Sequence, residues 1–141
     1  MKTIVYLSKS VFPMHENQLK DILHSSRIHN AALNLSGVLL YANGIFLQLL
    51  EGRDAVVDIL YKRILADQRH TNIITLVDES IAEKKFERWW MGFAVTHSDK
   101  IKELASYLLS IVDLDAGSKS TAAALAIKDL ITREDLEIEF S

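Results

Sequence analysis

The Asn43-Gly44 pair, placed between two apolar runs, is the feature that most constrains the fold of this chain. The run VLLY ends at Tyr41, and the run IFLQLLEG ends at Gly52. Asn-Gly readily adopts the positive φ angles of a tight hairpin turn, so apolar runs on both sides of it predict a β-hairpin. The fold is therefore expected to contain a sheet built around residues 38–52.

The elements on either side of the hairpin follow from hydrophobic periodicity. The pattern predicts strands at residues 2–9, 72–78 and 89–96, and helices at residues 16–30 and 53–68. Both faces of the first strand are largely apolar, which favours a central position covered on both sides. Residues 31–36 are expected to link the first helix to the hairpin.

The predicted order is β-α-β-β-α-β-β, which indicates an α+β sandwich with two helices stacked on one face of the sheet. Ferredoxin-like folds share this order. Two further helices are predicted at residues 99–112 and 118–132, with a break at residues 115–118. These C-terminal helices either cover the open face of the sheet or form an interface. We therefore expect one domain over residues 1–97 and a helical extension, as a cap or an interface, over residues 98–141.

Charge and residue usage narrow the classes of function. The 141 residues carry a net charge of −3 and the longest basic cluster is Lys84-Lys85, so no direct nucleic-acid binding is expected. No apolar run approaches the ~20 residues of a membrane span, and a cytoplasmic location is the default expectation. The chain has no Cys, which excludes disulfides and thiolate chemistry, and its five His residues lack metal-ligand spacing.

Tyr6 and Gln48 are the first candidate site residues. A Tyr on the inner face of a central strand is usually a core residue with its hydroxyl satisfied. Gln48 is more informative, because Phe46 and Leu50 share its face of the strand and favour a covered surface. A buried amide needs several hydrogen-bond partners, which points to a polar ligand or a polar neighbour.

Asn30, Arg63 and Asp67 each have an ordinary structural interpretation. Asn30 ends a predicted helix, where Asn is commonly a cap. Arg63 and Asp67 are four residues apart on a helix, the spacing of a surface ion pair that contributes under about 1 kcal/mol. In the last predicted strand, Trp89 and Met91 are expected on one face and are compatible with a plain core. Together, however, these groups converge on the region between the helices and the sheet, which favours a bound polar ligand.

The order and spacing of six segments resemble the BLUF family of flavin-based blue-light sensors. The segments are Tyr6-Leu7-Ser8, Ser26-Arg27-Ile28-His29-Asn30, Leu35-Ser36-Gly37-Val38-Leu39-Leu40-Tyr41, Phe46-Leu47-Gln48-Leu49-Leu50-Glu51-Gly52, Ile64-Leu65-Ala66-Asp67-Gln68-Arg69-His70 and Phe86-Glu87-Arg88-Trp89-Trp90-Met91. The resemblance covers about residues 1–97, and the helical remainder is similar to the C-terminal helices of short, stand-alone BLUF proteins. The absence of Cys also rules out the cysteinyl photochemistry of LOV sensors.

The resemblance implies a flavin held without a covalent bond between the two helices and the sheet, FAD being favoured over FMN. Tyr6 would donate an electron and a proton, and Gln48 would lie between Tyr6 and the flavin. The cofactor-binding set implied is Tyr6, Ser8, His29, Asn30, Gln48, Arg63, Asp67, Arg69, His70, Trp89 and Met91. His29 stands where many relatives have Asn, and Ser36 replaces a commoner Thr while keeping the hydroxyl.

Light absorption would thus rearrange the Gln48 hydrogen bonds and change a surface that a downstream signalling protein reads. No enzymatic activity of its own is expected, and the helical tail favours a homo-oligomer. The competing interpretation is a flavin-free, ferredoxin-like module that binds a metabolite or a protein. A small flavin-dependent oxidoreductase is disfavoured, because no acid-base pair or nicotinamide site is evident in the sequence.

Overall fold

The predicted hairpin consists of β2 (Ser36–Ala42) and β3 (Ile45–Gly52), paired antiparallel around a two-residue turn. Asn43 has a φ of 45° and Gly44 a φ of 81°, the positive angles that such a turn needs. The computed structural model describes residues 1–141 except 12–13, 15, 88, 112–117 and 139–141. Of the predicted break at residues 115–118, residues 115–117 lie outside the described residues.

The remaining elements form in the predicted order. They are β1 (Lys2–Ser10), α1 (Glu16–Leu33), α2 (Asp54–Ala66), β4 (His70–Ser80), β5 (Gly92–Val95), α3 (Ser98–Ser110) and α4 (Ser118–Arg133). The sheet has the strand order β4-β1-β3-β2-β5, in which β5 runs parallel to β2 and the other neighbours are antiparallel. This mixed five-stranded sheet with its helices confirms the α+β, ferredoxin-like prediction, and β1 is a central strand as expected.

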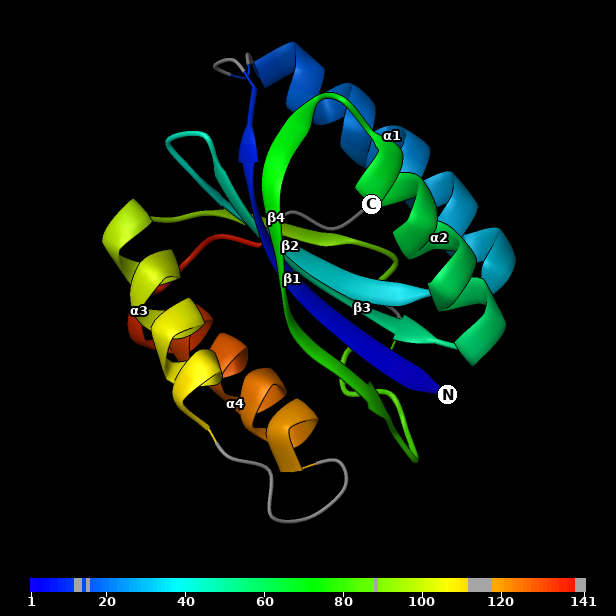
Figure 1. The fold of residues 1–141 in the computed structure, drawn as a ribbon. Coiled ribbons are helices and arrows are strands. Elements are labelled where there is room, and N and C mark those ends of the chain that lie inside the picture. Colours follow the sequence, from blue (N-terminus) through cyan, green and yellow to red (C-terminus); the bar gives the residue numbers. More distant parts are fainter. Residues whose placement is uncertain (12–13, 15, 88, 112–117, 139–141) are drawn as a thin grey trace.

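Helices α1 and α2 lie on one face of the sheet and α3 and α4 on the other (Figure 1), and each face has its own hydrophobic core. On one face, Ile4, Tyr6 and Leu50 pack with side chains of α1 and α2. On the second face, Leu47 and Leu49 pack with side chains of α3 and α4. Successive residues of a strand point to opposite faces, so β3 supplies both cores. Helices α3 and α4 thus cover the second face of the sheet.

Two boundaries differ most from the prediction. Helix α1 continues to Leu33, and the chain leaves it through Asn34, whose φ of 53° is left-handed. The helix is extended because Ala31, Ala32 and Leu33 all favour helix, so the expected linker shrinks to two residues. Strand β5 begins only at Gly92, because the preceding backbone turns and bonds elsewhere: the Trp89 N–H donates to the Phe86 carbonyl at 3.0 Å.

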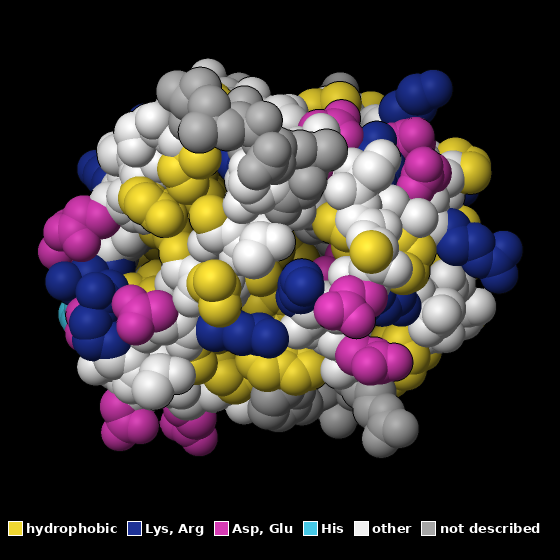
Figure 2. Space-filling model, turned by 90° about the horizontal axis from the view of Figure 1, so that it is seen from below, with side chains coloured by type: hydrophobic (Ala, Val, Ile, Leu, Met, Phe, Trp, Pro, Cys, Tyr) yellow, Lys and Arg dark blue, Asp and Glu magenta, His cyan; other side chains and the backbone are white. Residues whose placement is uncertain are grey.

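Hydrophobic side chains are exposed among charged ones on the underside of the molecule (Figure 2). Lys or Arg and Asp or Glu side chains interleave on that face, so it presents no broad field of one sign. Among the described residues, no helix is long and apolar enough to cross a membrane.

The cover formed by α3 and α4 can be tested through Ile127, which is fully buried against the second face. Ile127→Ala is expected to lower the free energy of unfolding by about 2–5 kcal/mol, because it leaves a cavity in a closed core. The matched control is Leu125→Ala on the same helix, where the side chain is 64% exposed and a change within about 0.5 kcal/mol is expected. Urea titration measures both; equal effects would contradict the packing of α4 on the sheet.

Candidate functional site

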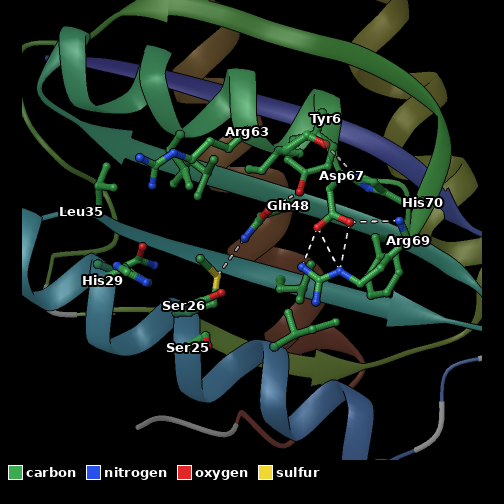
Figure 3. A pocket seen from close by; sticks show the side chains of 18 of the residues that line it. Tyr6, Ser25, Ser26, His29, Leu35, Gln48, Arg63, Asp67, Arg69 and His70 are labelled. Carbon is green, nitrogen blue, oxygen red and sulfur yellow. Dashed lines mark hydrogen bonds and ion pairs between the residues drawn. The ribbon is translucent and has the colours of Figure 1, made fainter.

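A cavity of about 820 Å³ lies between α1 and α2, with the sheet as its floor (Figure 3). Most of the predicted site residues line it: Tyr6, His29, Asn30, Gln48, Arg63, Asp67, Arg69, His70 and Met91. Leu39, Phe46 and Leu50 supply an apolar floor. Ser8 and Trp89, also predicted for the site, do not line the cavity.

Tyr6 and Gln48 form a hydrogen-bonded pair on the floor of the cavity. They lie directly opposite each other in the β1–β3 register, so their side chains emerge side by side on the same face. Both are buried, and the Tyr6 hydroxyl donates to Oε1 of Gln48. The Gln48 Nε2 atom donates in turn to Sδ of Met91 at 3.3 Å. The structure thus joins three predicted residues into one chain, Tyr6–Gln48–Met91.

Burial raises the pKa of Tyr6, and the nearby Tyr61 and Asp67 raise it further. The phenol therefore stays protonated at neutral pH and acts as a donor towards Gln48. Its ring packs against that of Tyr61, with centroids 5.5 Å apart, and against the His70 ring at 6.3 Å. These contacts fix the direction of the hydroxyl.

Asn30 lies inside α1 and not at its end, so the helix-cap interpretation is wrong. The side chain is buried, and its Nδ2 donates to the Trp90 carbonyl. From one turn earlier on the helix, Nε of Arg27 donates to the Met91 carbonyl at 3.1 Å. Helix α1 is thereby bonded to the segment that carries Met91. The sequence does not reveal the contact of Asn30 with the Trp90 carbonyl, because it predicts a helix that ends at residue 30 and so places Asn30 at the terminus.

Asp67 pairs with Arg69 and not with Arg63, so the alternative interpretation of Arg63 and Asp67 as an i,i+4 ion pair is wrong. The carboxylate accepts from Nη2 of Arg69 at 2.5 Å, from its Nε at 3.0 Å and from its backbone N–H at 2.9 Å. Helix α2 ends at Ala66, and the extended backbone of Asp67 turns its carboxylate away from the previous helical turn. The hydrogen bonds from Arg69 lower the pKa of Asp67. Arg63 lines the cavity from α2 (Figure 3).

His70 connects the end of α2 to β1. Its Nε2 lies 2.6 Å from the Ile64 carbonyl oxygen, which can only accept, so Nε2 carries the proton. In the neutral ring Nδ1 is then an acceptor, and Ser8 donates to it at 3.0 Å. Ser8 is buried and does not line the cavity; its hydroxyl instead holds the His70 ring.

Trp89 and Met91 point to opposite faces of the sheet, so the expectation that they share a face is wrong. Trp89 packs on the second face, where its ring centroid lies 5.0 Å from that of Phe86. Met91 is buried on the cavity side. The prediction treated both as residues of a regular strand, but they precede β5, where the backbone is irregular and strict alternation does not apply.

Further cavity residues come from one face of α1. They include Gln18, Ile22, Ser25 and Ser26. Gln18, Ile22, Ser25 and His29 follow the spacing i, i+4, i+7, i+11, the helical signal that could have revealed them. Gln18, Ser25 and His29 are polar and concealed it, because a polar helical face is normally turned to solvent. Among the described residues, no group of three or more His, Asp or Glu is arranged to hold a metal ion.

The Asp67–Arg69 pair yields a test of cavity electrostatics. Arg69→Gln is expected to raise the pKa of Asp67 towards its usual range, because the largest cause of its lowering is removed. A lowered pKa means that the pair stabilises the folded state at neutral pH and that this stabilisation is lost as the pH falls through the folded-state value. Since both side chains are partly exposed, we expect less than about 1 kcal/mol. NMR titration of the Asp67 carboxyl carbon measures the shift, with Arg53→Gln at the other end of α2 as the control.

The fold and the cavity define a small α+β domain with a cavity beside a hydrogen-bonded Tyr–Gln–Met chain. The family model described as "BLUF: Sensors of blue-light using FAD" matches residues 1–92. The chain belongs to this BLUF family, whose members are blue-light sensors that use FAD.

Known proteins agree with this assignment. Photoactivated adenylate cyclase subunit beta of Euglena longa is 38% identical over 91 residues, which cover 64% of this chain and 10% of the relative. The chain thus spans about a tenth of the length of the curated relatives it matches. The structure of BlsA in its photo-activated state is 30% identical with a TM-score of 0.67 and covers 89% of this chain and 93% of BlsA. The dark state of BlrB, a BLUF protein, is 27% identical with a TM-score of 0.66, with coverage of 89% and 93%.

The cavity residues fit a flavin ring. A flavin is flat and largely apolar over its faces, with hydrogen-bonding groups along one edge, and the cavity has an apolar floor with amides at its side. The Gln48 amide is buried, yet its nitrogen donates to a thioether sulfur, which is a weak acceptor. A buried amide with so weak a partner can accommodate a stronger one from a ligand.

Proposed function

We propose that this chain senses blue light through FAD bound without a covalent bond in the cavity, with Tyr6 as the electron and proton donor and Gln48 as the switching amide. The observation that carries the proposal is the Tyr6–Gln48–Met91 hydrogen-bonded chain on the cavity floor. When bound, the flavin supplies a chromophore that becomes a strong oxidant on absorbing blue light.

The chain's own groups are arranged for a coupled transfer. The Tyr6 proton already points at Oε1 of Gln48, so a Tyr6 that gives up an electron can release its proton along the same hydrogen bond. Gln48 carries a donor and an acceptor on one planar amide, and turning it exchanges the two. The bond to Met91 Sδ is weak, so its loss opposes this turn only slightly. After the turn the Tyr6 hydroxyl faces the amide NH₂ group and can accept from it, so the amide has two hydrogen-bonded arrangements, as a local switch requires.

The remaining cavity residues would hold the chromophore. We propose that Asn30 and His29 bond its polar edge from α1, and that Arg63, Asp67, Arg69 and His70 contact the ring or its ribityl chain from the α2 side. Ser8 would act indirectly, because its hydroxyl is hydrogen-bonded to Nδ1 of His70 and holds that ring in place. Trp89 would respond from the second face, since it lies two residues from Met91 and not in the cavity.

The output is proposed to be a protein contact and not catalysis by this chain. Residues 1–97 would form the flavin-binding part and residues 98–141 the extension that presents the altered surface. A downstream signalling protein in the cytoplasm, or a second copy of the chain in a homo-oligomer, would read it. Exposed apolar side chains on α3 and α4, such as Tyr107 and Leu125, support this assignment of the output surface.

The absorption spectrum before and after blue light tests the proposal. Reconstituted protein is expected to be yellow and to show a flavin band that shifts reversibly to the red. Chromatography of the released chromophore distinguishes FAD from FMN. A colourless protein, or a band that does not move, would favour a flavin-free binding module instead.

A further inference from the structure

Glu51 is a buried carboxylate that the proposed photochemistry does not use. It lies near the end of β3 and is 1% exposed. Its Oε2 accepts from the Lys85 backbone N–H at 2.9 Å, and its Oε1 from the Phe86 backbone N–H at 2.5 Å and from the Ser36 hydroxyl at 3.4 Å. Burying a carboxylate is costly unless donors surround it, and here Oε1 has two donors and Oε2 has one. The arrangement ties the β4–β5 connection to β3.

The same connection carries Met91 at its far end. There the Gly37 N–H donates to the Trp89 carbonyl at 2.8 Å, Asn30 bonds the Trp90 carbonyl and Arg27 the Met91 carbonyl. The far end is thus attached to α1 and β2. Only Glu51 attaches the connection to β3 through a charged group among the described residues.

Strand β3 also carries Gln48, three residues before Glu51. The distance between Gln48 Nε2 and Met91 Sδ therefore depends on how the connection sits relative to β3. An N–H···S contact is too weak to set that distance by itself, so the framework must hold the two atoms together. On the second face, the fully buried Phe86 packs against Trp89, and Nζ of Lys128 on α4 lies 5.0 Å from the centroid of the Phe86 ring. The backbone N–H of Phe86 is the group that Glu51 holds.

We propose that Glu51 is a positioning residue for the switch: by holding the Lys85 and Phe86 amides to β3, it places Met91 Sδ against Gln48 in the dark. This rests on the proposed function of the Tyr6–Gln48–Met91 chain. A local anchor that only stabilises the connection is the competing explanation, and it predicts no effect at Met91.

Glu51→Gln in the flavin-loaded protein separates the two explanations. The amide keeps an acceptor for the Phe86 N–H but turns an NH₂ group towards the Lys85 N–H. Loss of that hydrogen bond is expected to speed hydrogen exchange of the Lys85 amide about tenfold. The positioning role further predicts that the Met91 ε-methyl resonance of methionine-labelled protein moves in the dark, before any illumination. A faster Lys85 exchange with an unmoved Met91 resonance would overturn the proposal.

The control substitutions lie in the same β4–β5 connection and at a donor to the Glu51 carboxylate. Glu83→Gln neutralises an exposed Glu whose partner is Lys85 Nζ at 3.5 Å, and it is expected to leave the Met91 resonance unchanged. Met91→Leu assigns the resonance among the three Met residues of the chain. If Glu51→Gln does not fold, Ser36→Ala removes one donor to the carboxylate and is expected to move the Met91 resonance in a folded protein; no movement there would overturn the proposal.

The experiment also separates this inference from the proposed function. The Met91 resonance is read in darkness and does not depend on a photocycle. A wild-type protein without a red shift would refute the light-sensing proposal. A normal red shift with Met91 unmoved by Glu51→Gln would refute the positioning role alone.

Discussion

Tyr6→Phe is expected to leave the flavin bound and to reduce the light-induced red shift by about 100-fold or more at a fixed photon dose. The Phe ring keeps the packing against Tyr61 and His70, so the cavity keeps its shape. Only the hydroxyl is lost, and with it the proton that points at Gln48 Oε1. Absorbance difference spectra under timed illumination measure the effect, and the flavin-to-protein ratio shows that binding is retained.

The matched control for this substitution is Tyr61→Phe. The Tyr61 ring packs against that of Tyr6, but its hydroxyl bonds Thr75 Oγ1 at 2.6 Å, away from Gln48. We expect the red shift to persist in this variant. A full red shift in Tyr6→Phe, or its loss in both variants, would contradict the assignment of Tyr6 as the specific donor.

Gln48→Leu is expected to abolish the red shift while the flavin still binds, because the variant has no amide to turn. It also removes the acceptor of the Tyr6 hydroxyl and leaves a buried donor unsatisfied, which lowers the free energy of unfolding by about 1–3 kcal/mol. Spectra and urea titration of the apoprotein read the two effects separately. The control is Gln68→Leu in the exposed turn after α2, for which neither change is expected. A red shift that survives in Gln48→Leu would show that the switch lies elsewhere.

The sequence predicts those parts of the fold that depend on the turn preferences of particular residues and on the alternation of side chains between the two faces of a strand. Asn43-Gly44 identifies the hairpin, and the apolar neighbours of Gln48 place its amide on a covered face. The Asp67–Arg69 pair was not predicted, because it depends on where α2 ends, and element ends are poorly specified by periodicity. The opposite directions of Trp89 and Met91 depend on irregular backbone, to which strand alternation does not apply.

The role of Glu51 could not be predicted for a different reason. An acidic residue at the end of a strand is ordinarily solvated, and only the folded chain brings the Lys85 and Phe86 amides onto it. The partners lie 34 and 35 residues away in the sequence. No local pattern encodes such a contact, because it is set by how the β4–β5 connection folds back over the sheet.

The division of one sheet between two cores has a consequence for engineering. The strands that form the cavity floor also present Val38, Leu47 and Leu49 to α3 and α4. A fusion that joins an effector directly after residue 97 would strip those apolar side chains of their cover and create an aggregating surface. The smallest transplantable light-responsive unit therefore ends after α4, at or beyond Arg133, and an effector should be attached there.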